Sequence, residues 1–170
     1  MSRRARWAAA RVVADFRRRV AGHAEVHDVA GTDVGTLLVE LSEERRWRWV
    51  VTPYTAATPS LVKRGVFCLS DATSLTAGQL SRVDCAVLSA AVAVASSGHV
   101  MPGGTVRPAT LAAARDVVWL VPTARIVTDP DLAPAGPDAP HDTPNTSRTT
   151  RPIVILVHPE PGRPQRSTND

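Results

Sequence analysis

The distribution of proline limits most strongly how this chain can fold. Nine of its fourteen prolines lie between Pro130 and Pro164, and proline interrupts both helices and central strands. Residues 129–152 also offer few side chains that a core could bury. We therefore predict a flexible linker over residues 129–152, which separates a folded domain over residues 1–128 from a tail over residues 153–170.

The tail contains one apolar island. Five residues that favour strands, 153–157, stand between Pro152 and Pro159. They predict one short strand that docks on the edge of a sheet. The alternatives are a strand that pairs with a partner protein and an exposed segment that is prone to aggregate.

Hydrophobic periodicity predicts the remaining elements. Helical spacing covers residues 3–21, and a capping box at Thr76 and Gln79 opens a second helix that runs to about residue 97. Alternating patterns predict a three-strand antiparallel meander over residues 24–30, 36–41 and 46–52, with further strands at 65–69, 117–121 and 124–128 and a short helix at 108–115.

The predicted fold is α+β: an antiparallel sheet packed against two main helices, followed by a disordered, Pro-rich C-terminal segment. The predicted core is Phe16, Val20, Leu37, Val39, Leu41, Trp47, Trp49, Val66, Leu69, Leu80, Val83, Val87, Leu88, Val117, Trp119 and Val121.

Positive charge is concentrated at the N-terminus. The chain carries a net charge of +4, yet residues 1–23 hold seven arginines and a single aspartate. On a helix over residues 3–21 the arginines lie opposite the apolar side chains. Such a face binds phosphates, an anionic membrane surface or an acidic protein, or else is simply solvated. The candidate partner-binding residues are Arg3, Arg4, Arg6, Trp7, Arg11, Arg17 and Arg18.

Two histidines and a glutamate follow this helix. His23, Glu25 and His27 alternate, so a strand would place them on one face, where they could hold a divalent metal. His23 and Glu25 also match the first half of the zinc-deaminase signature, but its P-C-x-x-C half is absent. The polar face of an edge strand explains the same pattern, and we predict neither a metal nor a cofactor.

The segment around Trp47 and Trp49 superficially resembles a nucleic-acid-binding strand. Alternation puts both tryptophans on one face and Arg46 and Arg48 on the other. A stacking surface needs rings and guanidinium groups on the same side. We therefore predict that the two tryptophans belong to the core.

Partial resemblances to known families extend over short stretches. The predicted order of one helix, several strands and a second helix is similar to double-stranded-RNA-binding domains and to the secretion-chaperone-like fold of small bacterial proteins. Arg151-Pro152 with the aliphatic residues 153–157, and Thr76-x-x-Gln79-Leu80-x-x-Val83-Asp84, resemble a strand and the last helix of toxin-type endoribonucleases of the MazF kind, in the reverse chain order. The last resemblance implies an RNA-cleaving activity.

The two cysteines, Cys68 and Cys85, are too few for a disulfide framework or a zinc site, so we expect reduced thiols and a cytoplasmic location. The basic residues are arginines except Lys63, and with abundant Ala, Val and Pro this bias indicates GC-rich coding and a bacterial source. The longest uncharged run, 85–106, is interpreted as a buried helix and a turn rather than a transmembrane segment.

The leading hypothesis is a non-enzymatic interaction protein that presents residues 3–21 to an anionic or protein partner. The alternative is a small endoribonuclease or metal-assisted hydrolase that uses His23, Glu25 and His27. The sequence leaves the oligomeric state open.

Overall fold

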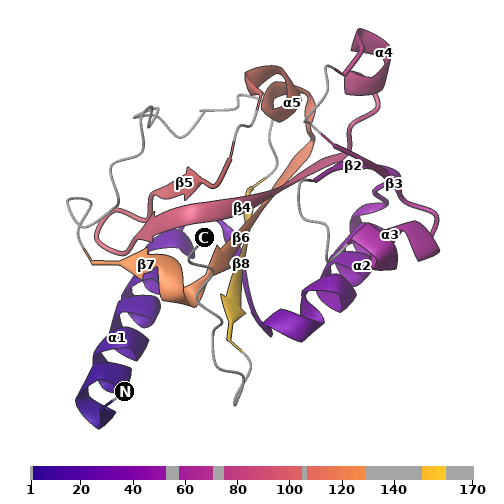
Figure 1. The fold of residues 1–170 in the computed structure, drawn as a ribbon. Coiled ribbons are helices and arrows are strands. Elements are labelled where there is room, and N and C mark those ends of the chain that lie inside the picture. The colour runs from indigo at the N-terminus through magenta and orange to yellow at the C-terminus, as the bar shows by residue number, and fades with distance from the viewer. Residues whose placement is uncertain (1, 53–57, 71–74, 105–106, 129–150, 160–170) are drawn as a thin grey trace, which may run out of the picture.

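The computed structural model describes residues 2–52, 58–70, 75–104, 107–128 and 151–159 (Figure 1). The helices are α1 (Arg3–Val20), α2 (Val34–Arg45), α3 (Thr58–Lys63), α4 (Ala77–Leu80) and α5 (Pro108–Ala113), with 3₁₀ turns η1 (Gly31–Asp33) and η2 (Thr123–Arg125). The strands are β1 (Glu25–Ala30), β2 (Trp49–Val51), β3 (Phe67–Leu69), β4 (Cys85–Val94), β5 (Val100–Pro102), β6 (Asp116–Pro122), β7 (Ile126–Val127) and β8 (Ile153–His158).

The strands form one sheet in the order β1-β8-β6-β4-β2-β3, and every pair along this order is parallel. The far half of β4 also pairs with β7 in parallel and with β5 in antiparallel orientation. Helices connect the parallel strands and cover both faces, so the fold is α/β and Rossmann-like. The predicted α+β fold with an antiparallel sheet on two helices is therefore wrong, and with it the likeness to the two antiparallel folds.

The first source of the error is the segment 34–45, where alternation predicts a strand at 36–41 and the chain instead forms α2. Leu37, Val39 and Leu41 do alternate, and that pattern favours a strand. The same segment also spaces Val34, Leu38 and Leu41 along one helical face, and this is the set that the protein buries. With α2 between them, β1 and β2 become parallel strands joined by a crossover rather than part of a meander.

The second source is the segment 85–94, where the sequence predicts a helix and the chain instead forms β4. The helix opened by Thr76 ends at Leu80 after a single capped turn. Strand β4 lies between β6 and β2 and is covered on both faces, so nearly all of its side chains are buried. A strand of this kind has a continuous apolar sequence with no alternation, which resembles a buried helix.

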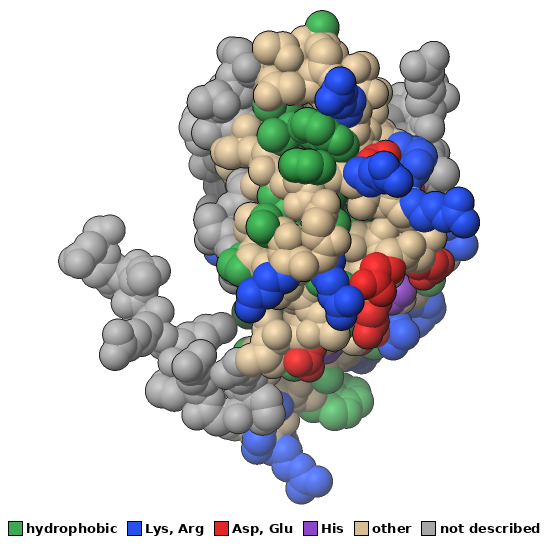
Figure 2. Space-filling view, turned by 90° about the vertical axis from the view of Figure 1, so that its right-hand side faces the viewer, with side chains coloured by type: hydrophobic (Ala, Val, Ile, Leu, Met, Phe, Trp, Pro, Cys, Tyr) green, Lys and Arg blue, Asp and Glu red, His purple; other side chains and the backbone are tan. Residues whose placement is uncertain are grey.

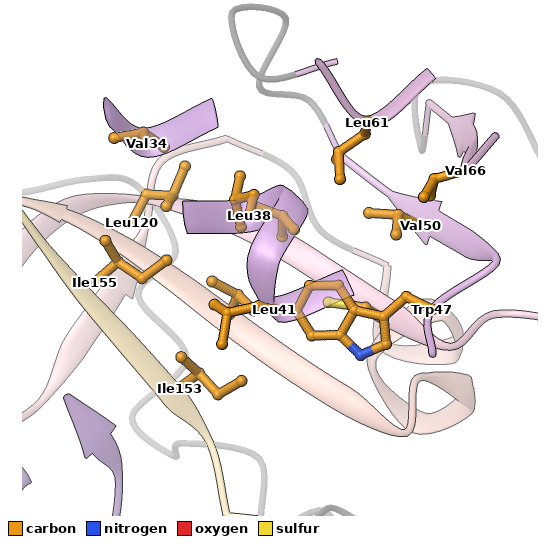
Figure 3. Packing of buried hydrophobic residues seen from close by; sticks show 13 residues of the cluster. Val34, Leu38, Leu41, Trp47, Val50, Leu61, Val66, Leu120, Ile153 and Ile155 are labelled. Carbon is orange, nitrogen blue, oxygen red and sulfur yellow. The ribbon is translucent and has the colours of Figure 1, made fainter. Parts of the chain in front are cut away.

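One face of the sheet, here called the α2 face, is covered by α2 and α3. Val34, Leu38 and Leu41 of α2 point onto the strands, as Figure 3 shows. They meet Ile153 and Ile155 of β8, and the cluster extends through Leu120, Val50, Leu61, Val66 and Trp47. This packing fixes the crossover between β1 and β2.

The opposite face, here called the α1 face, carries two clusters. Phe16 and Val20 at the end of α1 pack against Val154 and Leu156 of β8. Further along the sheet, side chains of β2, β4 and β6 pack with Leu111 of α5. Trp119 contacts both clusters, so the α1 face is continuous from β8 to β2.

Strand β8 occupies the predicted apolar island and adds His158. It lies inside the sheet, paired with β1 on one side and β6 on the other, rather than at an edge. Ile153, Ile155 and Leu156 are fully buried. The proposed linker lies outside the described residues except for Arg151 and Pro152, and of the tail only residues 153–159 are described.

Gly98, in the turn between β4 and β5, brings that turn against α1. Its φ is +76°, and a Cβ atom there would stand 2.9 Å from Arg19 Cγ and 3.3 Å from Val20 Cγ1. We expect Gly98→Ala to lower the free energy of unfolding by at least the roughly 1–2 kcal/mol that a left-handed conformation costs an L-residue. Urea denaturation measures this change.

Gly65 supplies the matched control, because its φ is +79° and a Cβ atom added there would meet nothing within 4 Å. Gly65→Ala incurs the same backbone strain without the collision. Gly98→Ala is therefore expected to be the more destabilising of the two. Equal losses would show that contact with α1 contributes nothing at this position.

Candidate functional site

The N-terminal half of α1 projects beyond the sheet. Ser2 caps the helix by accepting a hydrogen bond from the backbone N–H of Ala5 at 3.2 Å. Residues 2–11 are all exposed, including Trp7 at 67%, and Figure 1 shows this end of the helix extending away from the strands. Within the described part of the chain, the guanidinium groups of Arg3, Arg4, Arg6 and Arg11 form no hydrogen bond or ion pair.

The arginines at the other end of α1 are engaged. Arg17 pairs with Asp28 of β1 at 3.2 Å, and Arg18 pairs with Asp15 at 2.9 Å. Arg19, which is not among the residues predicted from sequence, donates from Nε and from one NH₂ group to the carbonyl of Ser96. The predicted arginine surface is thus divided: Arg17 belongs to the attachment of α1 to the body, and the first four arginines point outward.

The structure brings together two of the three candidate metal ligands. Glu25 and His27 share the α2 face of β1, with 2.7 Å between Glu25 Oε1 and His27 Nε2. Arg45, at the end of α2, donates to the other oxygen of Glu25. His23 lies in the turn before β1. No group of three or more His, Cys, Asp or Glu side chains suited to a metal is found among the described residues, and the Glu25 carboxylate serves as an anchor for α2.

A second acid–base pair, which sequence reasoning missed, lies at the carboxyl ends of β1 and β8. Asp28 Oδ1 stands 3.0 Å from His158 Nε2, and Asp28 also pairs with Arg17. The two residues are 130 positions apart, and only the pairing of β1 with β8 brings them close. The cluster joins both strands to α1.

Trp47 and Asp116 form a buried polar contact under α2. The indole Nε1–H donates to Asp116 Oδ2 at 2.7 Å, and Asp116 is 2% exposed. Arg115 Nε lies 3.5 Å from the same oxygen. Cys85 begins the neighbouring strand in register with Asp116. Burial, reinforced by the carboxylates of Asp116 and Asp84, raises the pKa of the Cys85 thiol well above its usual value, so this thiol is neutral and unreactive in the fold.

We expect Trp47→Phe to lower the free energy of unfolding by roughly 1.5–3 kcal/mol, the usual contribution of a hydrogen bond to a charged group. Phenylalanine also lacks the second ring of the indole, so the single substitution adds a loss of packing in the core to the loss of the donor. A double-mutant cycle with Asp116→Asn measures the pair. Additive losses in urea denaturation would show that the two side chains do not stabilise one another.

Trp49 does not join Trp47 in the core. Val50 lies on the α2 face, so its neighbours Trp49 and Val51 lie on the α1 face, whereas Trp47 packs on the α2 side. The prediction that both tryptophans share one buried face is wrong, because the chain leaves α2 through Arg46 at a φ of +57° and not along a regular strand. Trp49 is partly exposed and stacks on Phe67, with 5.0 Å between ring centroids.

The topology marks one further location. The connection after β2 leads to the edge strand β3, and the connection after β4 leads the opposite way to β6. Ligands of such sheets bind beyond the carboxyl ends of the strands where this reversal occurs. Here the buried Thr52 follows β2, and residues 53–57, which come next, lie outside the described residues.

Comparison with known proteins identifies the fold and no activity. No protein-family model matches the chain, and no curated protein matches its sequence. The crystal structure of a DUF162 family protein from Deinococcus radiodurans is similar, with a TM-score of 0.66 and 17% sequence identity, and the alignment covers 88% of this chain and 98% of that one. This likeness agrees with the α/β assignment. No helix in the described residues is both long and apolar enough to span a bilayer.

Proposed function

We propose that this protein is a non-enzymatic binding protein whose projecting helix α1 contacts the phosphates of a nucleic acid. The observation that carries the proposal is the exposure of the first half of α1, where Arg3, Arg4, Arg6 and Arg11 are exposed together with Trp7. Arginine is well suited to phosphate because its planar donor group binds two oxygens at once.

The spacing on α1 favours one continuous contact surface. Arg4, Trp7 and Arg11 stand three and four residues apart, so they lie on the same side of the helix. An aromatic ring is thus placed beside two guanidinium groups. This combination of ring and positive charge is typical of surfaces that bind nucleic acid.

The composition of the exposed half argues against a lipid surface. Its apolar residues are alanines at positions 5, 8, 9 and 10. A helix that lies in a membrane interface needs large apolar side chains to bury, and here Trp7 is the only one. An acidic protein partner would use the same charges and is separated from nucleic acid by the experiment below.

A hydrolytic role for His23, Glu25 and His27 has no comparable support. Glu25 already accepts from Arg45 and pairs with His27. Its carboxylate is thus committed to holding α2 against β1. The cytoplasmic location remains part of the proposal, and two free cysteines, of which Cys85 is buried, accord with it.

The test is fluorescence anisotropy of labelled oligonucleotides with the full chain across a salt titration, with polyglutamate as competitor. Phosphate contact predicts an affinity that falls steeply and linearly in log–log form as salt rises. It also predicts weak competition by polyglutamate at equal charge. Absence of binding at low salt, or displacement by polyglutamate as effective as by unlabelled oligonucleotide, would contradict the proposal.

A further inference from the structure

The edge of the sheet at β3 presents an aromatic pair on the α1 face. The rings of Trp49 in β2 and Phe67 in β3 are stacked, with an interplanar angle of 24°. The parallel register aligns these two residues directly. Phe67 is 61% exposed, so its ring is available to solvent while the pairing of β2 with β3 holds it in place.

A guanidinium group completes this surface. The Cζ atom of Arg82, which follows α4, lies 5.5 Å from the centroid of the Trp49 ring. Arginine stacks on aromatic faces through its delocalised, planar charge. Trp49, Phe67 and Arg82, here called the stacking platform, thus bring rings and positive charge to one side of the sheet, although they come from three separate segments.

Arg82 is the positive charge shown in contact with the stacking platform. Arg48, next to Trp49 in the chain, and Lys63, at the end of α3, are also exposed. The backbone carbonyl of Arg48 accepts from the N–H of Phe67. The Asp84 carboxylate accepts hydrogen bonds from the backbone N–H groups of Arg48 and Trp49, which fixes the position of this acidic group next to the platform. Figure 2 looks onto the side of the molecule where α2, α3 and β3 lie in Figure 1, and it shows exposed hydrophobic side chains with both basic and acidic side chains on the same side.

A peptide strand fits this edge less well than a planar ligand. Strand β3 has three residues, and the N–H of Phe67 and the carbonyl of Leu69 are already bonded to Arg48 and Thr52. In a strand, backbone groups point alternately to the two sides, so only Cys68 offers its N–H and carbonyl to the open edge. One residue cannot form the ladder by which an added strand gains affinity.

We infer that the stacking platform binds a base of a single-stranded nucleic acid. This inference rests on the proposed function in that the partner is a nucleic acid, and it adds that the bases must be unpaired. A base in a single strand can stack on Phe67 while the neighbouring phosphates meet the basic side chains. In a duplex the bases are already stacked on one another, so the platform would contribute nothing.

Helix α1 is attached near β8 to the face that carries the stacking platform, and the platform lies at the opposite edge on β2 and β3. At the usual strand spacing, the five intervals from β1 to β3 span roughly 24 Å. The basic end of α1 projects beyond the sheet, and the thirteen residues from Phe16 back to Arg3 add at most roughly 20 Å. A strand of twelve nucleotides, at about 3.4 Å or more for each, reaches roughly 41 Å and is thus comparable to this separation.

The experiment compares oligothymidine of twelve nucleotides with an abasic oligomer of the same length, each labelled for fluorescence anisotropy. The wild-type chain is expected to bind oligothymidine more tightly. Phe67→Ala is expected to weaken binding of oligothymidine roughly five- to hundredfold, the range for loss of one base–aromatic stack, and to leave binding of the abasic oligomer unchanged. Phe67→Trp, which keeps an aromatic ring at this position, is expected to retain the preference for oligothymidine over the abasic oligomer.

Val62 provides the matched control, because it is apolar, 54% exposed and located on the neighbouring helix α3. Val62→Ala is expected to leave both affinities unchanged. Equal binding of the two oligomers by the wild type, or an equal effect of Phe67→Ala on both, overturns the inference. A change of oligomeric state in size-exclusion chromatography with unchanged oligothymidine binding also overturns it and makes the β3 edge a protein interface.

Failure of this inference is distinguishable from failure of the proposed function. If substitutions in α1 weaken binding while Phe67→Ala does not, the stacking platform is excluded and α1 remains. If Phe67→Ala removes the preference for bases while α1 substitutions have no effect, the platform stands and the role of α1 is excluded.

Discussion

Replacing Arg3, Arg4, Arg6 and Arg11 together by glutamine is expected to reduce affinity for a single-stranded oligonucleotide roughly hundred- to thousandfold at about 0.1 M salt. Each arginine that neutralises a phosphate contributes about 0.7 to the slope of log affinity against log salt. Loss of four such contacts therefore lowers the magnitude of that slope by about three. Glutamine is a good helix former, so α1 itself persists, and circular dichroism verifies this.

The matched control replaces the same four arginines by lysine. Lysine keeps the charge and still binds phosphate as a point charge, so the salt slope is expected to stay close to that of the wild type. The role of α1 would be refuted by a glutamine variant that binds with unchanged affinity and slope. An equal loss in both variants would assign recognition to guanidinium geometry instead of charge.

Phe16→Ala is expected to lower the free energy of unfolding by about 3–5 kcal/mol, the usual cost of truncating a buried aromatic side chain. Phe16 is fully buried and packs, with Val20, against β8 on the α1 face. It is the largest side chain by which α1 is attached to the sheet, so its loss leaves a cavity that the small neighbours cannot fill. Urea denaturation followed by tryptophan fluorescence measures the change.

Trp7→Ala is the appropriate comparison, since it truncates an aromatic residue of the same helix that is 67% exposed. Surface substitutions of this kind usually change stability by less than about 0.5 kcal/mol. The two variants therefore separate attachment from binding: Phe16→Ala lowers stability, and Trp7→Ala lowers affinity for nucleic acid. Similar stability losses in both would mean that the exposed half of α1 also packs on the body.

Helix α1 is predictable from the sequence, because a long amphipathic helix with a clear polar side leaves little ambiguity. The same pattern does not separate the arginines that attach α1 from those that project. Arg17 meets Asp28 and Arg19 meets Ser96 only after the chain has folded. Nothing in local spacing marks either contact.

The parallel sheet is hard to predict for a physical reason. In a parallel sheet covered on both faces the inner strands lose the alternation of polar and apolar residues, and the sequence of β4 therefore resembles a helix. Segment 34–45 has both the alternation of a strand and the spacing of a helix. The helix is favoured because it buries Leu38 fully, and this burial requires the sheet on which α2 packs. The stacking platform is equally hidden, since Trp49, Phe67 and Arg82 come from three segments.

The position of β8 has a consequence for how the chain is made. Glu25 pairs with Ile153 and Ala30 with His158, so each residue of β1 pairs with a residue of β8 that lies 128 positions later in the chain. During synthesis β1 and the end of α1 emerge from the ribosome long before β8, the strand against which both pack. Pairings this distant in sequence form slowly. A nascent chain that stops before residue 153 thus exposes an unpaired strand and an apolar helix face, which makes it a natural substrate for chaperones.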